Sequence, residues 1–192
     1  MMRHLRILAA LLSLSLISAG PADDGRWYAG DYSFSDELGG FRILSVTGSG
    51  TREDPIEITE QLDSTDPVTL VIRAKTSPEL HSLLQGAFHV RVVARNTSGL
   101  AWIGCDFELQ EIRGKPSDFN DGLSFGQANP NPDFISSDRF VRFESRFESF
   151  DRLRFESGHV DPLDRAKFGF FIADVTPVAE FYMVQDPQIP SS

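Results

Sequence analysis

The sequence predicts an all-β fold, a single antiparallel β-sandwich of about ten strands with one short helix, following a cleaved signal peptide. Short runs of alternating apolar and polar residues recur at the roughly 8–12-residue spacing of sandwich strands. Phenylalanine is abundant, with 16 Phe in 192 residues, and Phe favours the half-buried surface of a sheet. No shift in composition divides the chain, so one domain is expected over residues 23–192.

The first half of the domain contains four predicted strands separated by glycine and proline. The strand that starts at Phe41 is expected to pair with the strand before it, across a turn at residues 36–40. Asp54 precedes Pro55, which restarts the chain in an extended conformation. The strands expected here cover residues 27–34, 41–47, 56–59 and 68–74.

One segment has the signals of a helix, near residues 78–85. Ser77 is a suitable N-cap, Pro78 occupies the first helical position, and Gly86 follows the last one. Leucines at helical spacing give the segment one apolar face. With about two turns, this helix needs tertiary packing to be stable.

The second half contains further strands and a long loop. Residues 168–175 are apolar at nearly every position, which predicts a central strand covered on both faces. Residues 114–133 form the predicted loop, interrupted only at 123–125, and a connection of this length is often functional. The other strands expected here cover residues 88–95, 100–110, 153–155 and 181–184, with Pro187 and Pro190 ending the last one.

The tetrapeptide Arg-Phe-Glu-Ser occurs three times, at 142–145, 146–149 and 154–157. Phenylalanines at helical intervals would make residues 137–150 a helix, whereas the alternation at 151–156 indicates a strand. We favour two edge strands here, with the helix as the alternative. We interpret the repeat as a solvated Arg/Glu surface over core phenylalanines; the alternative is an acidic-glycan site.

Residues 1–22 have the order of a secretory signal peptide. Arg3 and Arg6 precede an apolar run over residues 7–17, and small residues follow up to Ala22, where cleavage is expected. The run is too short for a permanent membrane span. Without a lipobox cysteine, a C-terminal anchor or a later transmembrane segment, the predicted location is secreted or periplasmic.

Charge and cysteine content exclude several classes of protein. The formal net charge of −10 argues against nucleic acid as a partner, because such binding depends on Lys and Arg. Cys105 is the single cysteine, so no intramolecular disulfide is expected. It lies on an apolar strand face, where a buried thiol is expected rather than a reactive one.

Neither a catalytic motif nor a metal-binding motif is present. His81, His89 and His159 are scattered, without metal-ligand spacing. We therefore predict no catalytic residue and no cofactor. The alternative is a loose calcium site formed by Asp118, Asn120 and Asp121, whose oxygens suit that ion although the spacing is not that of a calcium-binding hand.

Part of the chain resembles secreted bacterial β-sandwich domains of the Ig-like or jelly-roll type, found in cell-surface and exopolysaccharide-associated proteins. The resemblance rests on Asn96-Thr-Ser-Gly99, Trp102 and the alternation through Phe107 and Leu109, and it covers roughly residues 90–184. Some of these proteins carry a Pro-Glu-Pro sorting segment, which this sequence lacks. The resemblance implies a sandwich fold and an extracellular location.

The leading functional hypothesis is a non-catalytic protein that binds a glycan, an envelope component or a protein partner through loop 114–133. Recognition by loops on a rigid scaffold is common. The candidate ligand-binding residues are Trp102, Phe119, Asp121 and Phe125. The first alternative is a secreted carboxylate-dependent hydrolase of the glycosidase type, and the second is a structural subunit of an extracellular matrix.

Overall fold

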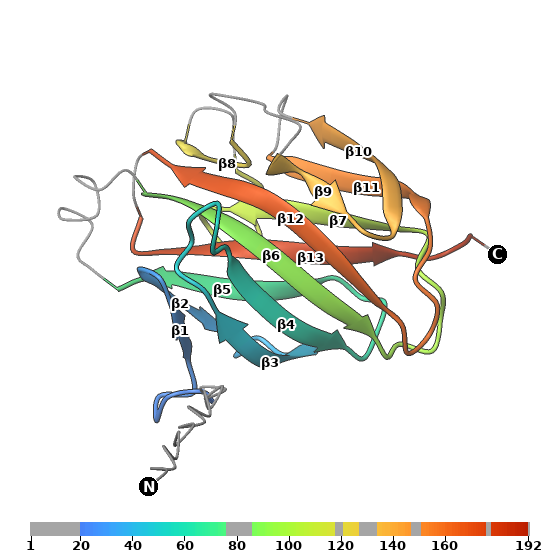
Figure 1. Cartoon of the computed structure of the whole chain (residues 1–192), viewed down its shortest axis with the longest axis horizontal. Helices are drawn as coiled ribbons and strands as arrows, with labels where there is room; N and C mark the ends of the chain where they lie inside the picture. The colour runs from blue at the N-terminus through green and yellow to red at the C-terminus, as the bar shows by residue number, and fades with distance from the viewer. Residues whose placement is uncertain are drawn as a thin grey trace, which may run out of the picture.

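The computed structural model describes residues 20–75, 86–117, 121–126, 134–146, 151–175 and 178–191. Two β-sheets lie face to face and enclose a layer of apolar side chains, so the predicted sandwich is confirmed (Figure 1). Residues 1–19 of the predicted signal peptide and the predicted helix at 78–85 lie outside the described residues. The strands are β1 (Trp27–Ala29), β2 (Tyr32–Ser35), β3 (Phe41–Thr47), β4 (Ile56–Leu62), β5 (Val68–Ala74), β6 (Gly86–Asn96), β7 (Gly104–Gln110), β8 (Leu123–Ser124), β9 (Ser136–Ser137), β10 (Phe140–Arg146), β11 (Arg152–Gly158), β12 (Arg165–Asp174) and β13 (Glu180–Gln188).

The two sheets differ in size. The seven-stranded sheet has the order β1-β2-β5-β13-β7-β11-β10, and the six-stranded sheet contains β3-β4-β6-β12-β8 with β9 paired to β12. The pairings are antiparallel except for β4 with β6, which run parallel from Ile56↔Val90 to Leu62↔Asn96. The chain reaches this parallel pair because β5, which lies between them in sequence, belongs to the other sheet.

Two expectations for the N-terminal strands were wrong. Residues 27–34 form two strands that pair with each other, and the turn between them has a positive φ of 51° at Gly30. A Cβ at Gly30 would lie 2.7 Å from the carbonyl oxygen of Ser49, so a side chain does not fit there. Strand β3 pairs with β4 instead of the strand before it, while β2 pairs with β5. The chain therefore changes sheets between β2 and β3.

The ends of two later strands also differ from expectation. Strand β7 begins at Gly104 instead of residue 100, because Trp102 forms an isolated bridge with Val160. Strand β13 continues through Pro187 to Gln188. Its pairing with β5 stops at Gln185, so Pro187 has a paired neighbour on the β7 side alone. A proline without an N–H is tolerated at such a position.

The core is rich in stacked and edge-on phenylalanines. Phe107 of β7 lies at its centre, with ring centroids 5.9 Å from Phe155, 5.0 Å from Phe168 and 5.1 Å from Phe170. The expectation that residues 168–175 are covered on both faces was wrong. Alternate residues of β12 are buried, whereas Phe171 is half-buried on the outer face against His89 and Phe134.

One polar contact crosses the core. Glu60 of β4 and Gln185 of β13 belong to different sheets, are at most 1% exposed, and share a 3.0 Å hydrogen bond in which the Gln185 amide is the donor. The second carboxyl oxygen of Glu60, Oε1, has no hydrogen-bond partner among the described residues. Burial raises the pKa of Glu60 to about 8, against a lowering effect from the Gln185 hydrogen bond. Glu60 is therefore a protonated core residue at neutral pH.

The two described copies of the tetrapeptide, at 142–145 and 154–157, pair at the edge of the seven-stranded sheet and form a row of alternating Arg and Glu side chains, here called the charge ladder. Strand β10 covers residues 140–146, so the preference for a strand over a helix is confirmed for that segment, while residues 147–150 lie outside the described residues. The expectation of two edge strands was wrong for β11, which lies between β7 and β10. In the β10–β11 pairing Arg142 lies opposite Glu156, Phe143 opposite Phe155, and Glu144 opposite Arg154. The Arg-Phe-Glu units at 142–144 and 154–156 thus meet in antiparallel register, which places arginine opposite glutamate at both positions.

The ladder continues into the sheet through a buried carboxylate. Asp106 of β7 is 2% exposed and accepts hydrogen bonds from Arg152 at 2.5 Å and from Arg154 at 2.8 Å. Both arginines come from β11, so the carboxylate joins the two strands on the outer face. The interpretation of the repeat as an Arg/Glu surface over core phenylalanines agrees with the contacts of Arg152 and Arg154, while the acidic-glycan alternative stays a prediction.

Gly158, at the end of β11, lies directly against the backbone of Arg139. A Cβ at this position would lie 1.9 Å from the carbonyl oxygen of Arg139. We therefore expect Gly158→Ala to destabilise the protein by roughly 2–4 kcal/mol, because backbone must move. Urea denaturation measures this change, with Val175→Ala as the control, since Val175 is 71% exposed. Equal stability of the two variants would contradict the prediction.

Over the described ranges, the chain has no helix with the length and apolar character needed to cross a membrane.

Candidate functional site

Two of the candidate ligand-binding aromatics are core residues. Trp102 is 0% exposed and Phe125 is 4% exposed. The indole nitrogen of Trp102 donates to the Ser98 hydroxyl at 3.3 Å, and the Phe125 ring lies edge-on to Phe170 with centroids 5.3 Å apart. Neither ring offers a face for a ligand to stack on, so both contribute to packing.

The rest of the predicted loop site is only partly described. Asp121 is half-buried, and its carboxylate accepts a 3.0 Å hydrogen bond from the backbone of Leu123, which closes a short turn. Asp118, Phe119 and Asn120 lie outside the described residues. The calcium hypothesis and the contact proposed for Phe119 therefore stay predictions. Within the described ranges, no group of three His, Cys, Asp or Glu is placed to hold a metal ion.

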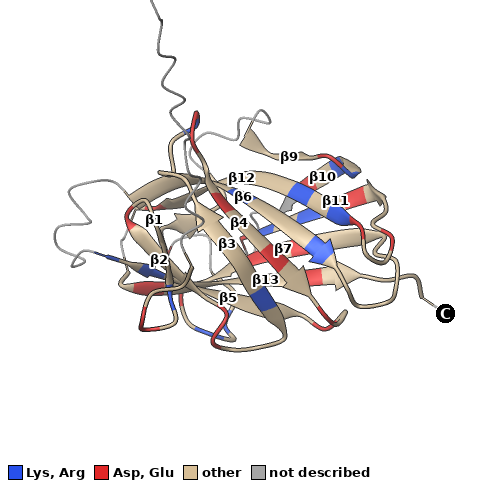
Figure 2. Cartoon of the chain, turned by 60° about the horizontal axis from the view of Figure 1, so that its bottom comes forward, with Lys and Arg blue, Asp and Glu red and all other residues tan. Residues whose placement is uncertain are grey.

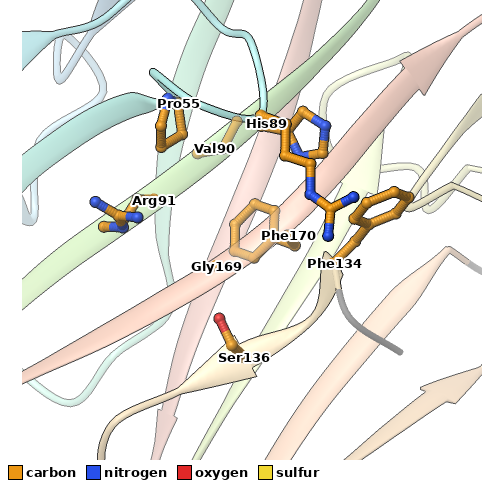
Figure 3. A pocket seen from close by; sticks show the side chains of 9 residues that line it. Pro55, His89, Val90, Arg91, Phe134, Ser136, Gly169 and Phe170 are labelled. Carbon is orange, nitrogen blue, oxygen red and sulfur yellow. The ribbon is translucent and has the colours of Figure 1, made fainter. Parts of the chain in front are cut away.

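The structure instead contains a depression on the outer face of the six-stranded sheet. Its volume is about 180 Å³, and its floor is the pair of strands β6 and β12 at Val90, Gly169 and Phe170. Figure 3 shows Arg91 on one side, Phe134 on the other, and His89 and Ser136 above and below. We call this depression the outer groove; Arg52 and Pro55 complete its lining.

Gly169 makes room for the groove. It pairs with Arg91 of β6 and with Ser136 of β9, so its missing side chain leaves a gap in the middle of the sheet face. A Cβ there would lie 2.6 Å from the Ser136 hydroxyl oxygen. A hydroxyl and a guanidinium therefore flank the same gap.

Aromatic and cationic groups meet at one end of the groove. The guanidinium carbon of Arg52 lies 5.2 Å from the ring centroid of Phe134, within the range of a cation–π contact. The His89 ring lies between Phe134 and Phe171, with centroids 5.1 Å and 4.9 Å away. Burial lowers the pKa of His89, and the charge of Arg52 lowers it further. His89 is therefore expected to be neutral at pH 7, a flat ring beside a permanent cation.

Further cations extend along the same face. Arg95 of β6 lies directly opposite Arg165 of β12, and Lys167 is two residues along; all three side chains are exposed. Figure 2 shows this concentration of blue along β12 and at the end of β6. Arg91 is paired with Glu57 at 3.3 Å on the neighbouring strand. A chain with net charge −10 thus carries a cationic track on one sheet face.

The groove lining contains no carboxylate among its described residues. The arrangement can hold an anion through guanidinium groups and a ring through Phe134, which is the chemistry of binding.

Sequence reasoning missed the outer groove because its residues come from four separate segments. His89 and Arg91 belong to the strand predicted at 88–95, whereas Arg52 and Phe134 lie outside every predicted strand. One signal was available. Phe171 breaks the alternation of β12 by placing an aromatic ring on the face where Lys167 and Arg165 also lie.

The fold and groove define a two-sheet β-sandwich with a cationic, aromatic-lined outer face. Comparison with protein-family models, with curated proteins and with solved structures found no match.

Proposed function

We propose that this protein is a secreted, non-catalytic binding protein for an acidic polysaccharide, and that the outer groove holds one acidic sugar unit. The observation that supports the proposal is the stacking of Arg52 over Phe134 beside Arg91 at the rim of one depression. An aromatic face packs against the apolar side of a sugar ring, and a guanidinium binds a carboxylate through paired hydrogen bonds.

The dimensions of the site suit a polymer. The groove, at about 180 Å³, is smaller than the roughly 300–1,000 Å³ of pockets that enclose drug-sized ligands. It therefore takes a single unit, while the neighbouring units lie along the cationic track of Arg95, Arg165 and Lys167. Long-range attraction by such a track raises the association rate for a polyanion and weakens with salt.

The predicted loop and the groove are contiguous in sequence. Phe134 directly follows the predicted loop at 114–133, which contains the candidate residues Phe119 and Asp121. We retain these two residues as contacts to be tested by alanine substitution. The predicted signal peptide supports an extracellular ligand, because it directs the folded domain out of the cytoplasm.

Alanine substitution of Arg52 or Phe134 is expected to weaken binding to polygalacturonate by about tenfold or more. The first change removes the guanidinium that binds the carboxylate, and the second removes the ring that packs against the sugar. Affinity electrophoresis and calorimetry at low salt measure the dissociation constant, with neutral dextran as the uncharged probe. The matched control is Arg42→Ala, because Arg42 is 65% exposed on the same sheet and lies outside the groove.

The control variant is expected to bind like the wild type, and dextran is expected not to bind. Equal affinity of the Arg52, Phe134 and Arg42 variants would overturn the groove as the site. Binding of dextran as strong as that of polygalacturonate would overturn the acidic ligand.

A further inference from the structure

Strand β10 forms the outer edge of the seven-stranded sheet (Figure 1). Among the described residues, β11 is its only partner within that sheet. Two apolar side chains are exposed on this edge strand: Val141 is 87% exposed and Phe143 is 37% exposed. An exposed strand edge can pair with a strand from another chain unless its side chains prevent that.

The side chains of β10 favour pairing with an identical strand. An Arg-x-Glu sequence that meets a second Arg-x-Glu in antiparallel register places arginine opposite glutamate at both positions. The protein already contains this pairing on the other side of β10, where Arg142 lies opposite Glu156 and Glu144 lies opposite Arg154. The Arg142–Glu156 ion pair there has an N–O distance of 3.6 Å. Charges normally keep sheet edges apart, but these charges attract a copy of the same edge.

We propose that β10 pairs with β10 of a second copy of this chain, antiparallel and centred on Phe143. Arg142 then lies opposite Glu144 of the second copy, and Phe143 lies opposite its own counterpart. The twofold symmetry makes both halves of the contact identical, as a closed dimer requires. The two seven-stranded sheets become one continuous sheet, and the charge ladder runs unbroken from β11 of one copy to β11 of the other.

The contact also covers the exposed apolar side chains of β10. Phe143 packs on Phe155 within its own chain, with ring centroids 6.5 Å apart, and 37% of it stays exposed. A second Phe143 across the twofold axis would cover that exposed part, in the way that cross-strand aromatic pairs stabilise a sheet. This inference is independent of the proposed function, because the outer groove is on the other sheet.

The first test is a pair of charge-reversal variants, Arg142→Glu and Glu144→Arg. In a dimer of either variant alone, residues 142 and 144 of the two copies would carry the same charge and face each other. Sedimentation velocity is therefore expected to show monomers for each variant and dimers for the wild type. Mixing the two variants restores opposite charges at every position and is expected to recover a dimer. Arg42→Glu is the control, since its exposure of 65% is close to the 73% of Arg142, and it is expected to stay dimeric.

A wild type that remains monomeric up to about 0.5 mM, which corresponds to a free energy weaker than about −4.5 kcal/mol, would overturn the proposal. A dimer that persists equally in both single variants would also overturn it. Circular dichroism confirms that the variants are folded, which is expected because exposed ion pairs contribute little to stability.

The second test fixes the register. Phe143→Cys is expected to form an intermolecular disulfide under mild oxidation, because the two residues 143 face each other across the axis. Val141→Cys is expected to remain reduced, since the two copies of residue 141 are offset by four positions, about 14 Å along the strand. Cys105 is buried and does not compete. Disulfide formation at 141 as fast as at 143 would contradict this register.

Discussion

Replacing Glu60 with glutamine is expected to raise the free energy of unfolding at pH 9 by roughly 3–5 kcal/mol and to change it little at pH 4. In the folded protein burial raises the pKa of Glu60 to about 8, from an ordinary value of 4.5. Between pH 4.5 and about pH 8, the carboxyl group of residue 60 has lost its proton in the unfolded chain but keeps it in the folded protein. The stability of the wild type therefore falls as the pH rises from about 4.5 to about 8, and above that range the full loss caused by Glu60 remains.

The substitution E60Q removes this dependence and keeps the contact across the core. An amide has nearly the shape of the protonated carboxyl group, and its oxygen still accepts the hydrogen bond from Gln185. Urea denaturation at several pH values measures the free energy of unfolding of both proteins. The control is Glu57→Gln on the same strand, whose side chain is 39% exposed and pairs with Arg91. Parallel curves for wild type and E60Q across pH 4–9 would contradict a buried, protonated Glu60.

The period of two in the sequence predicts the strands well, because one face of each strand is buried and the other is wet. Strands β4, β5 and β6 fall close to their predicted residues for this reason. The pattern carries no information on which sheet a strand enters. Strand β3 was therefore paired with the wrong neighbour, and the parallel contact of β4 with β6 was not predicted.

The candidate site was harder to predict than the fold. Trp102 and Phe125 were singled out as aromatic residues near a loop, but aromatic residues near a loop are often part of the end of a core, as both are here. The outer groove depends on Gly169, which has no side chain. Its position forms a gap in the sheet face because Arg91 and Ser136 lie on the two neighbouring strands. Pairing across strands that are distant in sequence creates the site, and a local pattern cannot show it.

The Arg-Phe-Glu-Ser repeat illustrates the same limit within one short segment. Phe143 and Phe155 occupy the same position in two identical tetrapeptides and lie opposite each other in the structure. Phe155 is 1% exposed, because β11 lies inside the sheet, whereas Phe143 is 37% exposed on the edge strand. The two phenylalanines therefore contribute differently to the free energy of unfolding although their local sequences are identical. The strand order determines which of the two is buried in the core.

This difference leads to a matched pair of variants with a large expected contrast. Phe155→Ala is expected to reduce the free energy of unfolding by about 3–5 kcal/mol, the usual cost of removing a buried phenylalanine ring. Its ring lies 5.9 Å from Phe107 and 5.0 Å from Phe168, so the cavity would open in the centre of the aromatic cluster. Phe143→Ala is expected to cost about 1 kcal/mol or less, because its ring is already partly hydrated.

Denaturation of both variants in dilute solution separates this contrast from any self-association through β10, since a dimer contact is lost at low concentration. Wild-type protein at the same concentration is the reference. Comparable losses for the two variants would mean that β10 is as deeply embedded as β11, and β10 would then not form an edge open to a second copy. The stability measurement thus tests the strand order on which the proposed dimer depends, without measuring the dimer itself.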